Sequence, residues 1–154
     1  MPQQDSVTLP VRILVAVEGS EPSLRESSIK AAKYALKLAS AAHSELVGAC
    51  VVQIPEYIEE RTRRILRDEL FAKSSTTLDE IKDLSSKSSI KFEARVLETS
   101  GAIASAICTL AEKEKVDLIV LGTRASTSSL TKMMLGSVAL GVTNNAGCPV
   151  LVVR

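Results

Sequence analysis

Five short segments, four of them apolar runs and one alternating between apolar and charged residues, are separated by longer segments of helical character. The short segments are rich in β-branched residues and end near glycine, proline or serine, which is typical of buried strands. They lie at residues 11–17, 45–53, 90–97, 117–121 and 149–153. The segments between them have helical spacing or composition and lie at residues 20–43, 56–87, 103–115 and 136–146. The pattern predicts five strands connected by helices.

This alternation indicates the α/β fold class, with a parallel sheet whose two faces are both covered by helices. Right-handed crossovers leave few topologies, and the expected strand order is 3-2-1-4-5. Residues 90–97 alternate between apolar and charged side chains, which predicts an edge strand. In this order the first and fourth strands are neighbours at the switch point. A ligand is therefore expected beyond their carboxyl ends.

Two glycine-bearing segments are predicted to meet at that place. Glu18-Gly19-Ser20 follows the first strand, and the segment from Gly122 to Gly136 joins the fourth strand to the last helix. The N–H groups at a helix N-terminus lack partners, and the helix dipole favours an anion there. The pattern predicts a phosphate site. The competing interpretation is that Gly122 and Gly136 only turn the chain and start a helix.

The long helical segment at residues 56–87 leaves one question open. Its polar stretch Ser74-Ser-Thr-Thr77 is compatible with a break, so the sequence predicts either one helix or two. The basic residues between Arg61 and Arg67 alternate with acidic ones. This mixture favours a solvated helix face with ion pairs over a nucleic-acid site.

Composition narrows the class of protein. The 154 residues predict a polar tail at residues 1–9 and a single domain over residues 10–154. The net charge of +1 and the aromatic content of 3% argue against a nucleic-acid partner. No apolar stretch reaches the ~20 residues of a membrane span, so no membrane partner is expected. The tail also lacks the apolar core of a signal peptide.

Cysteine and histidine usage points to an ordinary cytoplasmic protein without a metal centre. The three cysteines, Cys50, Cys108 and Cys148, form no Cys-x-x-Cys pair and are expected to be reduced, core-like thiols. His43 closes a helical segment, with no second ligand at metal-binding spacing. The chain contains neither a P-loop nor a Gly-x-Gly-x-x-Gly motif after the first strand. No Ser/His/Asp arrangement is visible either.

Four fragments in order make the chain resemble the universal stress protein family. They are Ile13–Ser23, Val116–Gly122, Leu135–Val138 and Cys148–Val153, and the resemblance covers nearly the whole chain. It implies the adenine nucleotide alpha hydrolase-like fold and a site for ATP or AMP. It also implies a homodimer through the last strand, Val150–Val153. That strand is apolar and lies at the predicted sheet edge, where an unpaired edge favours association.

The resemblance also implies which residues hold the nucleotide phosphates. Gly122 and Arg124 would approach the phosphates. Gly136, Ser137 and Val138 would hold the phosphate chain with backbone N–H groups and a hydroxyl.

The remaining implied contacts include departures from the family pattern. Glu18 would face the ribose or an associated Mg²⁺, where the family usually has Asp, and Val17 and Val51 would flank the adenine. The ATP-binding branch has Gly-x-x-Gly, nine residues and then Gly-Ser/Thr. Here Ala125 replaces the second glycine, and ten residues instead of nine separate it from Gly136. Ser126 is expected to take over the position of that second glycine.

Two functions from different classes remain at this point. The first is a stress-response regulatory protein that binds ATP or AMP, with an unknown protein partner and at most slow ATP hydrolysis. No catalytic residue is nominated. An enzyme of the related adenine nucleotide hydrolase group is disfavoured, because no general base or nucleophile beyond Glu18 can be named. The second is a dimeric structural or interaction module of the same fold that has lost nucleotide binding.

Overall fold

The computed structural model describes residues 7–18, 22–123 and 135–154 of the chain. Strands and helices alternate along it, as the hydrophobic pattern predicts. The described elements are β1 (Arg12–Val17), α1 (Pro22–Ala42), β2 (Glu45–Gln53), α2 (Glu60–Lys87), β3 (Phe92–Thr99), α3 (Ile103–Lys113), β4 (Leu118–Gly122), α5 (Ser137–Asn145) and β5 (Val150–Val153).

The strands form one five-stranded sheet in the order β3-β2-β1-β4-β5, which confirms the predicted topology. All neighbouring strands are parallel. β1 lies at the switch point, where Ala16 pairs with Ala49 of β2 on one side and with Leu121 of β4 on the other. The carboxyl ends of β1 and β4 are therefore adjacent. The sequence predicted β3 and β5 as the edges, and they are.

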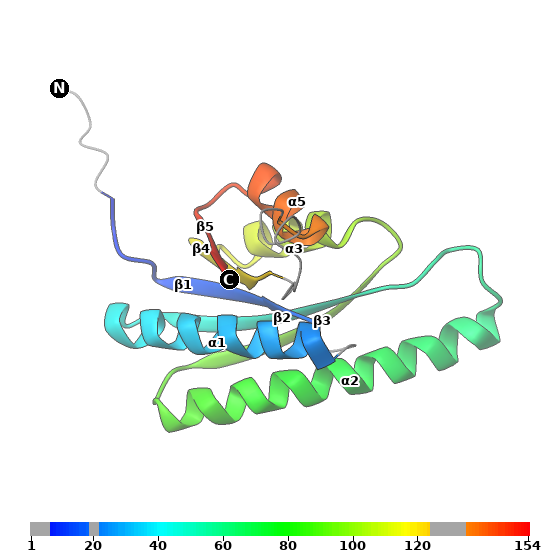
Figure 1. Ribbon diagram of the computed structural model, residues 1–154, viewed down its shortest axis with the longest axis horizontal. Coiled ribbons are helices and arrows are strands. Elements are labelled where there is room, and N and C mark those ends of the chain that lie inside the picture. The colour runs from blue at the N-terminus through cyan, green and yellow to red at the C-terminus, as the bar shows by residue number, and fades with distance from the viewer. Residues whose placement is uncertain (1–6, 19–21, 124–134) are drawn as a thin grey trace.

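Helices cover both faces of the sheet. Figure 1 shows α1 and α2 on one face and α3 and α5 on the other. Alternate side chains of β1 enter different cores, because neighbouring residues of a strand point to opposite faces. Ile13 and Val15 are buried towards α1 and α2, whereas Leu14 is buried with residues of α3 and α5. Buried alanines on α1, such as Ala31 and Ala35, leave that helix close to the sheet.

The long second helix is continuous. The sequence left open a break at residues 74–77, but α2 runs through them without interruption. Ser74 donates its hydroxyl to the carbonyl of Leu70 at 2.8 Å, and Thr77 donates to Lys73 at 3.4 Å. These i−4 hydrogen bonds satisfy the hydroxyls inside the helix, so both side chains are buried there. The helix begins at Glu60 rather than at residue 56.

The structure also bears on the histidine, the cysteines, and the expected absence of a metal centre and of a membrane span. His43 directly follows α1, is exposed, and has a left-handed φ of 56°, as a residue that ends a helix often does. Cys50 and Cys108 are buried, whereas Cys148 is only half-buried, and none of the three is in a disulfide. Within the described ranges there is no cluster of three or more metal-ligating side chains. In those same ranges no helix is both long and apolar enough to cross a membrane.

An ion-pair network joins the amino ends of three strands. The Arg12 guanidinium contacts Glu45 at 2.7 Å, Glu93 at 3.2 Å and Glu114 at 2.7 Å. Arg95 contacts Glu93 at 2.7 Å and Glu114 at 2.8 Å. The network holds the start of β1 against β2, β3 and the end of α3. It lies at the amino-terminal ends of the strands, opposite the predicted ligand crevice at their carboxyl ends.

We expect this network to make the protein sensitive to acid. The hydrogen bond from Arg12, followed by that from Arg95, lowers the pKa of Glu114, and Arg95 followed by Arg12 lowers the pKa of Glu93. A folded-state pKa below the unfolded value stabilises the protein above the unfolded value of about 4.5. This stabilisation is lost as the pH falls through the lowered pKa. Melting temperatures measured from pH 7 to pH 3 should therefore fall most steeply below about pH 4.5.

The matched variant Arg12→Met tests the cause of that acid sensitivity. It removes the largest influence on the pKa of Glu114 and one influence on the pKa of Glu93. We expect a lower melting temperature at pH 7 and a shallower fall towards pH 3. An acid profile parallel to that of the unchanged protein would show that the acid sensitivity arises elsewhere.

Candidate functional site

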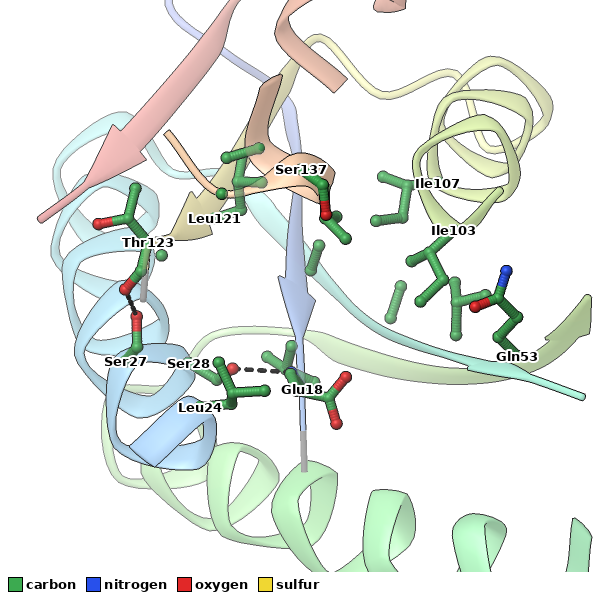
Figure 2. Close-up of a pocket in the computed structure, with 18 residues that line it drawn as sticks. Glu18, Leu24, Ser27, Ser28, Gln53, Ile103, Ile107, Leu121, Thr123 and Ser137 are labelled. Carbon is green, nitrogen blue, oxygen red and sulfur yellow. Dashed lines mark hydrogen bonds between the residues drawn. The ribbon is translucent and has the colours of Figure 1, made fainter. Parts of the chain in front are cut away.

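A cavity of about 310 Å³ lies at the carboxyl ends of β1 and β4. Its walls come from β1, β2, β4, the first turns of α1 and α3, and the start of α5. Figure 2 shows Ser137 on one side of the cavity, Glu18 and Leu24 on another, and Ile103, Ile107 and Gln53 on a third. Segments more than a hundred residues apart in the sequence are thus brought to one hollow at the switch point.

Seven of the residues that the sequence nominated line this cavity. They are Val17, Glu18, Val51, Gly122, Gly136, Ser137 and Val138. The other two nominated residues, Arg124 and Ser126, lie outside the described residues, as does Ala125. The expected convergence of the β1 exit with the β4 exit and the start of α5 is therefore present in the structure. The roles of the individual residues remain predictions.

The start of α5 presents backbone donors to the cavity. Gly136 is the residue before the helix, and its carbonyl accepts the first helical hydrogen bond from Leu140 at 2.9 Å. No side chain of the described residues caps this end of the helix. The N–H groups of Ser137, Val138 and Ala139 precede that first helical bond and have no partner within the helix. Together with the helix dipole they favour an anionic group at this end of the cavity.

Gly136 has no structural need to be glycine. Its φ of −60° and ψ of 158° are open to any residue, so no strain is relieved there. A Cβ built on Gly136 would find no described atom within 4 Å, so packing among the described residues does not require glycine either. Among the described residues, the missing side chain leaves space beside N–H groups that have no partner within the helix. A ligand that approaches the backbone closely is a sufficient reason for glycine at this position.

Gly122 is different, because the protein itself fills the space beside it. A Cβ on Gly122 would lie 2.7 Å from the carbonyl oxygen of Ser27 and 3.1 Å from its carbonyl carbon. These are backbone atoms of α1. Glycine at the end of β4 therefore lets α1 pack closely against the strand. This role was not foreseen from the sequence, which linked Gly122 to phosphate.

Two neighbouring serines of α1 hold the strand ends that form the cavity. Ser28 accepts a hydrogen bond from the backbone N–H of Glu18 at 2.7 Å. Ser27 donates its hydroxyl to the carbonyl of Thr123, directly after β4 (Figure 2). Both hydroxyls are therefore engaged with backbone groups. Sequence reasoning missed this pair, although the first turns of the helix after β1 must lie at the same edge of the sheet as the site.

The third side of the cavity is mainly apolar. Val51 of β2 and Ile107 of α3 are buried there, and Ile103 begins α3. The sequence nominated Val51 but missed the α3 residues. A signal existed, because α3 follows the edge strand β3, and its first turn must therefore lie at the same end of the sheet. The cavity thus has one end rich in backbone donors and another lined by aliphatic side chains.

The donor set decides which metal chemistry the cavity could support. Glu18 is the acidic side chain among the described lining residues, and Mg²⁺ prefers several oxygen ligands. One carboxylate does not form a metal site by itself. It fits Mg²⁺ held jointly with phosphate oxygens and water, as at many nucleotide sites. Any Mg²⁺ is therefore expected to arrive with a phosphate ligand rather than in its absence.

Comparison with known proteins decides the family. The model of the universal stress protein family matches residues 11–154, nearly the entire chain. The chain belongs to this family. A universal stress protein of Methanocaldococcus jannaschii is 34% identical over 146 residues, which cover 93% of this chain and 81% of the relative.

Solved structures agree with this fold. A universal stress protein from Lactobacillus plantarum has a TM-score of 0.75 and 22% identity, covering 96% of this chain and 99% of its own. A family member from Arabidopsis thaliana, solved with AMP bound, has a TM-score of 0.67 and 19% identity, covering 94% of this chain and 91% of its own. At these identities the structural similarity establishes the fold alone. The bound AMP is an observation on the Arabidopsis protein.

Proposed function

We propose that this universal stress protein binds an adenine nucleotide, ATP or AMP, at the switch point between β1 and β4. The observation that carries the proposal is the space that the described residues leave beside Gly136, where N–H groups of α5 without a helical partner face a cavity with an aliphatic far side. A nucleotide has a matching polarity, since its phosphates are anionic and its base is flat and largely apolar. The cavity volume of about 310 Å³ falls within the range of ligand pockets, roughly 300–1,000 Å³.

In this proposal the chain's residues bind and orient the ligand rather than transform it. The N–H groups of Ser137 and Val138 and the Ser137 hydroxyl hold phosphate oxygens. Val17 and Val51 contact the base, and Glu18 faces the ribose or a phosphate-bound Mg²⁺. Arg124 and Ser126 complete the phosphate contacts from the segment outside the described residues. The bound nucleotide alters the surface offered to a regulatory partner, and hydrolysis is slow at most.

One observation favours the competing function, a module of the same fold without a ligand. Gly122, one of the two motif glycines, is explained by its contact with the backbone of Ser27. A chain that kept this fold but lost its ligand would still need that glycine. Gly136 separates the two functions, because nothing within the described protein requires it to be glycine.

Extraction of a bound nucleotide tests the proposed function directly. The purified full chain is heat-denatured, and the supernatant is separated by ion-exchange chromatography. We expect an adenine nucleotide at a ratio approaching one per chain, or binding of added ATP with Mg²⁺ in calorimetry if the protein is isolated empty. An empty protein that also fails to bind at millimolar ATP would establish the ligand-free module.

We further propose that residues 10–154 form a single cytoplasmic domain that dimerises through β5. β5 is an edge of the sheet and pairs with β4 on its inner side. The carbonyls of Pro149 and Val153 accept hydrogen bonds from Ile119 and Thr123, both at 3.0 Å. Because backbone groups alternate along a strand, those of Val150 and Val152 face outward, where a second copy could pair with them.

Val152→Pro is expected to convert the dimer into a monomer. Proline removes the outward N–H of Val152, and an edge strand tolerates this loss without disturbing the inner ladder. Light scattering at micromolar concentration should give twice the chain mass of 16.4 kDa for the unchanged protein and the single mass for the variant. The control Val152→Thr keeps the N–H and should remain dimeric. An unchanged protein at the single mass would contradict the β5 dimer.

A further inference from the structure

Gln53 occupies a distinctive place in the cavity. It is the last residue of β2 and lines the side formed by Ile103 and Ile107. The polar side chains among the described lining residues are those of Glu18, Ser27, Ser28, Gln53, Thr123 and Ser137. Ser27 and Ser28 already bond to backbone groups of the chain. Gln53 therefore supplies the polar side chain on the aliphatic side of the cavity (Figure 2).

A hydrogen bond to the loop before α3 fixes which end of the Gln53 amide faces the cavity. The Nε2 group donates to the carbonyl of Gly101 at 2.8 Å. A carbonyl can only accept, so this contact assigns the amide nitrogen to the loop side. Gly101 is itself held, because its N–H donates to the Thr99 hydroxyl at 3.1 Å. Figure 2 shows the amide oxygen of Gln53 turned towards the cavity, away from the nitrogen.

We propose that the Oε1 atom of Gln53 accepts a hydrogen bond from the exocyclic amino group of the bound base, making Gln53 a specificity-determining residue. An acceptor in this position suits adenine, whose 6-position carries an amino donor. It disfavours binding of hypoxanthine and guanine, because their 6-position carries an oxygen acceptor that cannot donate to Oε1. The inference rests on the proposed nucleotide site and adds to it the means by which the base is chosen.

The orientation of the amide is what makes it selective. A freely rotating glutamine could offer either its oxygen or its nitrogen and would accept both kinds of base. Here a rotation that offered the nitrogen would break the bond to Gly101 and bring two carbonyl oxygens together. A site built around one acceptor rejects a ligand that also presents an acceptor, because neither group is then satisfied. Gly101 thus positions the residue that reads the base.

The test compares AMP with IMP by calorimetry on the full chain. The two bases differ at the 6-position, amino against oxo, and at the adjacent N1, which carries a hydrogen in IMP. We expect the unchanged protein to bind AMP about tenfold more tightly than IMP, the size of effect one satisfied or opposed hydrogen bond produces. Gln53→Met keeps the length of the side chain but removes the acceptor. This variant should reduce the preference for AMP over IMP to below about threefold, mainly by weakening the affinity for AMP. Inorganic tripolyphosphate, which has no base, should bind both proteins equally.

The outcomes separate this inference from the proposed function. A protein that binds neither AMP nor ATP refutes the nucleotide site itself. A protein that binds AMP with equal preference before and after Gln53→Met refutes the role of Gln53 and leaves the site intact. Weaker tripolyphosphate binding in the variant would show a disturbed cavity rather than a lost base contact, and it too would overturn the proposal. Gln53 is exposed, and melting curves check that the variant stays folded.

Discussion

Replacing Gly136 with aspartate is expected to weaken ATP binding by at least about a hundredfold while the protein stays folded. The new side chain enters the open space beside the N–H groups of Ser137 and Val138. Its carboxylate would repel a phosphate at the same place. Two like charges 4 Å apart near a protein surface oppose each other by about 4 kcal/mol. Salt reduces this figure, so a hundredfold loss is the cautious expectation.

The fold should tolerate this change, because aspartate is among the preferred residues before a helix and no described side chain caps α5 in the unchanged protein. Its charge also suits the helix dipole. Calorimetry with ATP and Mg²⁺ measures the affinity, and a melting curve measures the fold. A folded Gly136→Asp protein with unchanged ATP affinity would place the nucleotide elsewhere.

Gly136→Asn separates charge from bulk in this experiment. Asparagine matches aspartate in size and is also favoured before a helix, but it carries no charge. We expect an affinity between those of the unchanged protein and the aspartate variant. Equal losses in the two variants would show that the space itself is needed by the ligand. A much smaller loss with asparagine would show that electrostatic repulsion dominates.

The strand order could be predicted from the sequence because it depends on local patterns of apolar and polar residues. Apolar runs such as residues 117–121 predict strands, and the helical segments between these runs predict that the connected strands are parallel. Once the order is known, the exit of β1 and the start of α5 must lie at one edge of the sheet. The positions of Glu18, Gly136 and Ser137 around one cavity could therefore be predicted without coordinates.

What the sequence could not supply depends on the rotation of helices and on distances across the site. Whether Ser27 and Ser28 point towards the strand ends depends on how α1 is turned against the sheet. The orientation of the Gln53 amide depends on where the carbonyl of Gly101 lies, and that carbonyl belongs to a loop almost fifty residues away. Neither the rotation of α1 nor the orientation of the Gln53 amide can be inferred from hydrophobic periodicity, which indicates only which face of an element is buried.

The two motif glycines show the same limit most clearly. The sequence alone does not distinguish Gly122 from Gly136, since each lies at one end of the segment that connects the fourth strand to the last helix. The structure separates them by what stands beside each. Gly122 faces the backbone of α1, whereas Gly136 faces open space. A loss of stability is therefore expected from substituting the first, and a loss of binding from substituting the second.

Gly122→Ala is accordingly expected to destabilise the ligand-free protein by about 2–3 kcal/mol, in the upper part of the range of about 1–3 kcal/mol that is usual for overpacking. The added methyl would lie 2.7 Å from the Ser27 carbonyl oxygen, and backbone cannot turn away as a side chain can. Moving α1 would also disturb the Ser27 hydrogen bond to Thr123. For a chain of this length the melting temperature should fall by roughly 5–10 °C.

Gly136→Ala is the matched control, because the same methyl group is added beside no described atom within 4 Å. Its cost should stay under about 1 kcal/mol, the small disadvantage of alanine before a helix. Urea unfolding of both variants without nucleotide measures the difference. Equal stability of the two would mean that α1 can move away from β4 at little cost. Gly122 would then be free for the phosphate role that the sequence first indicated.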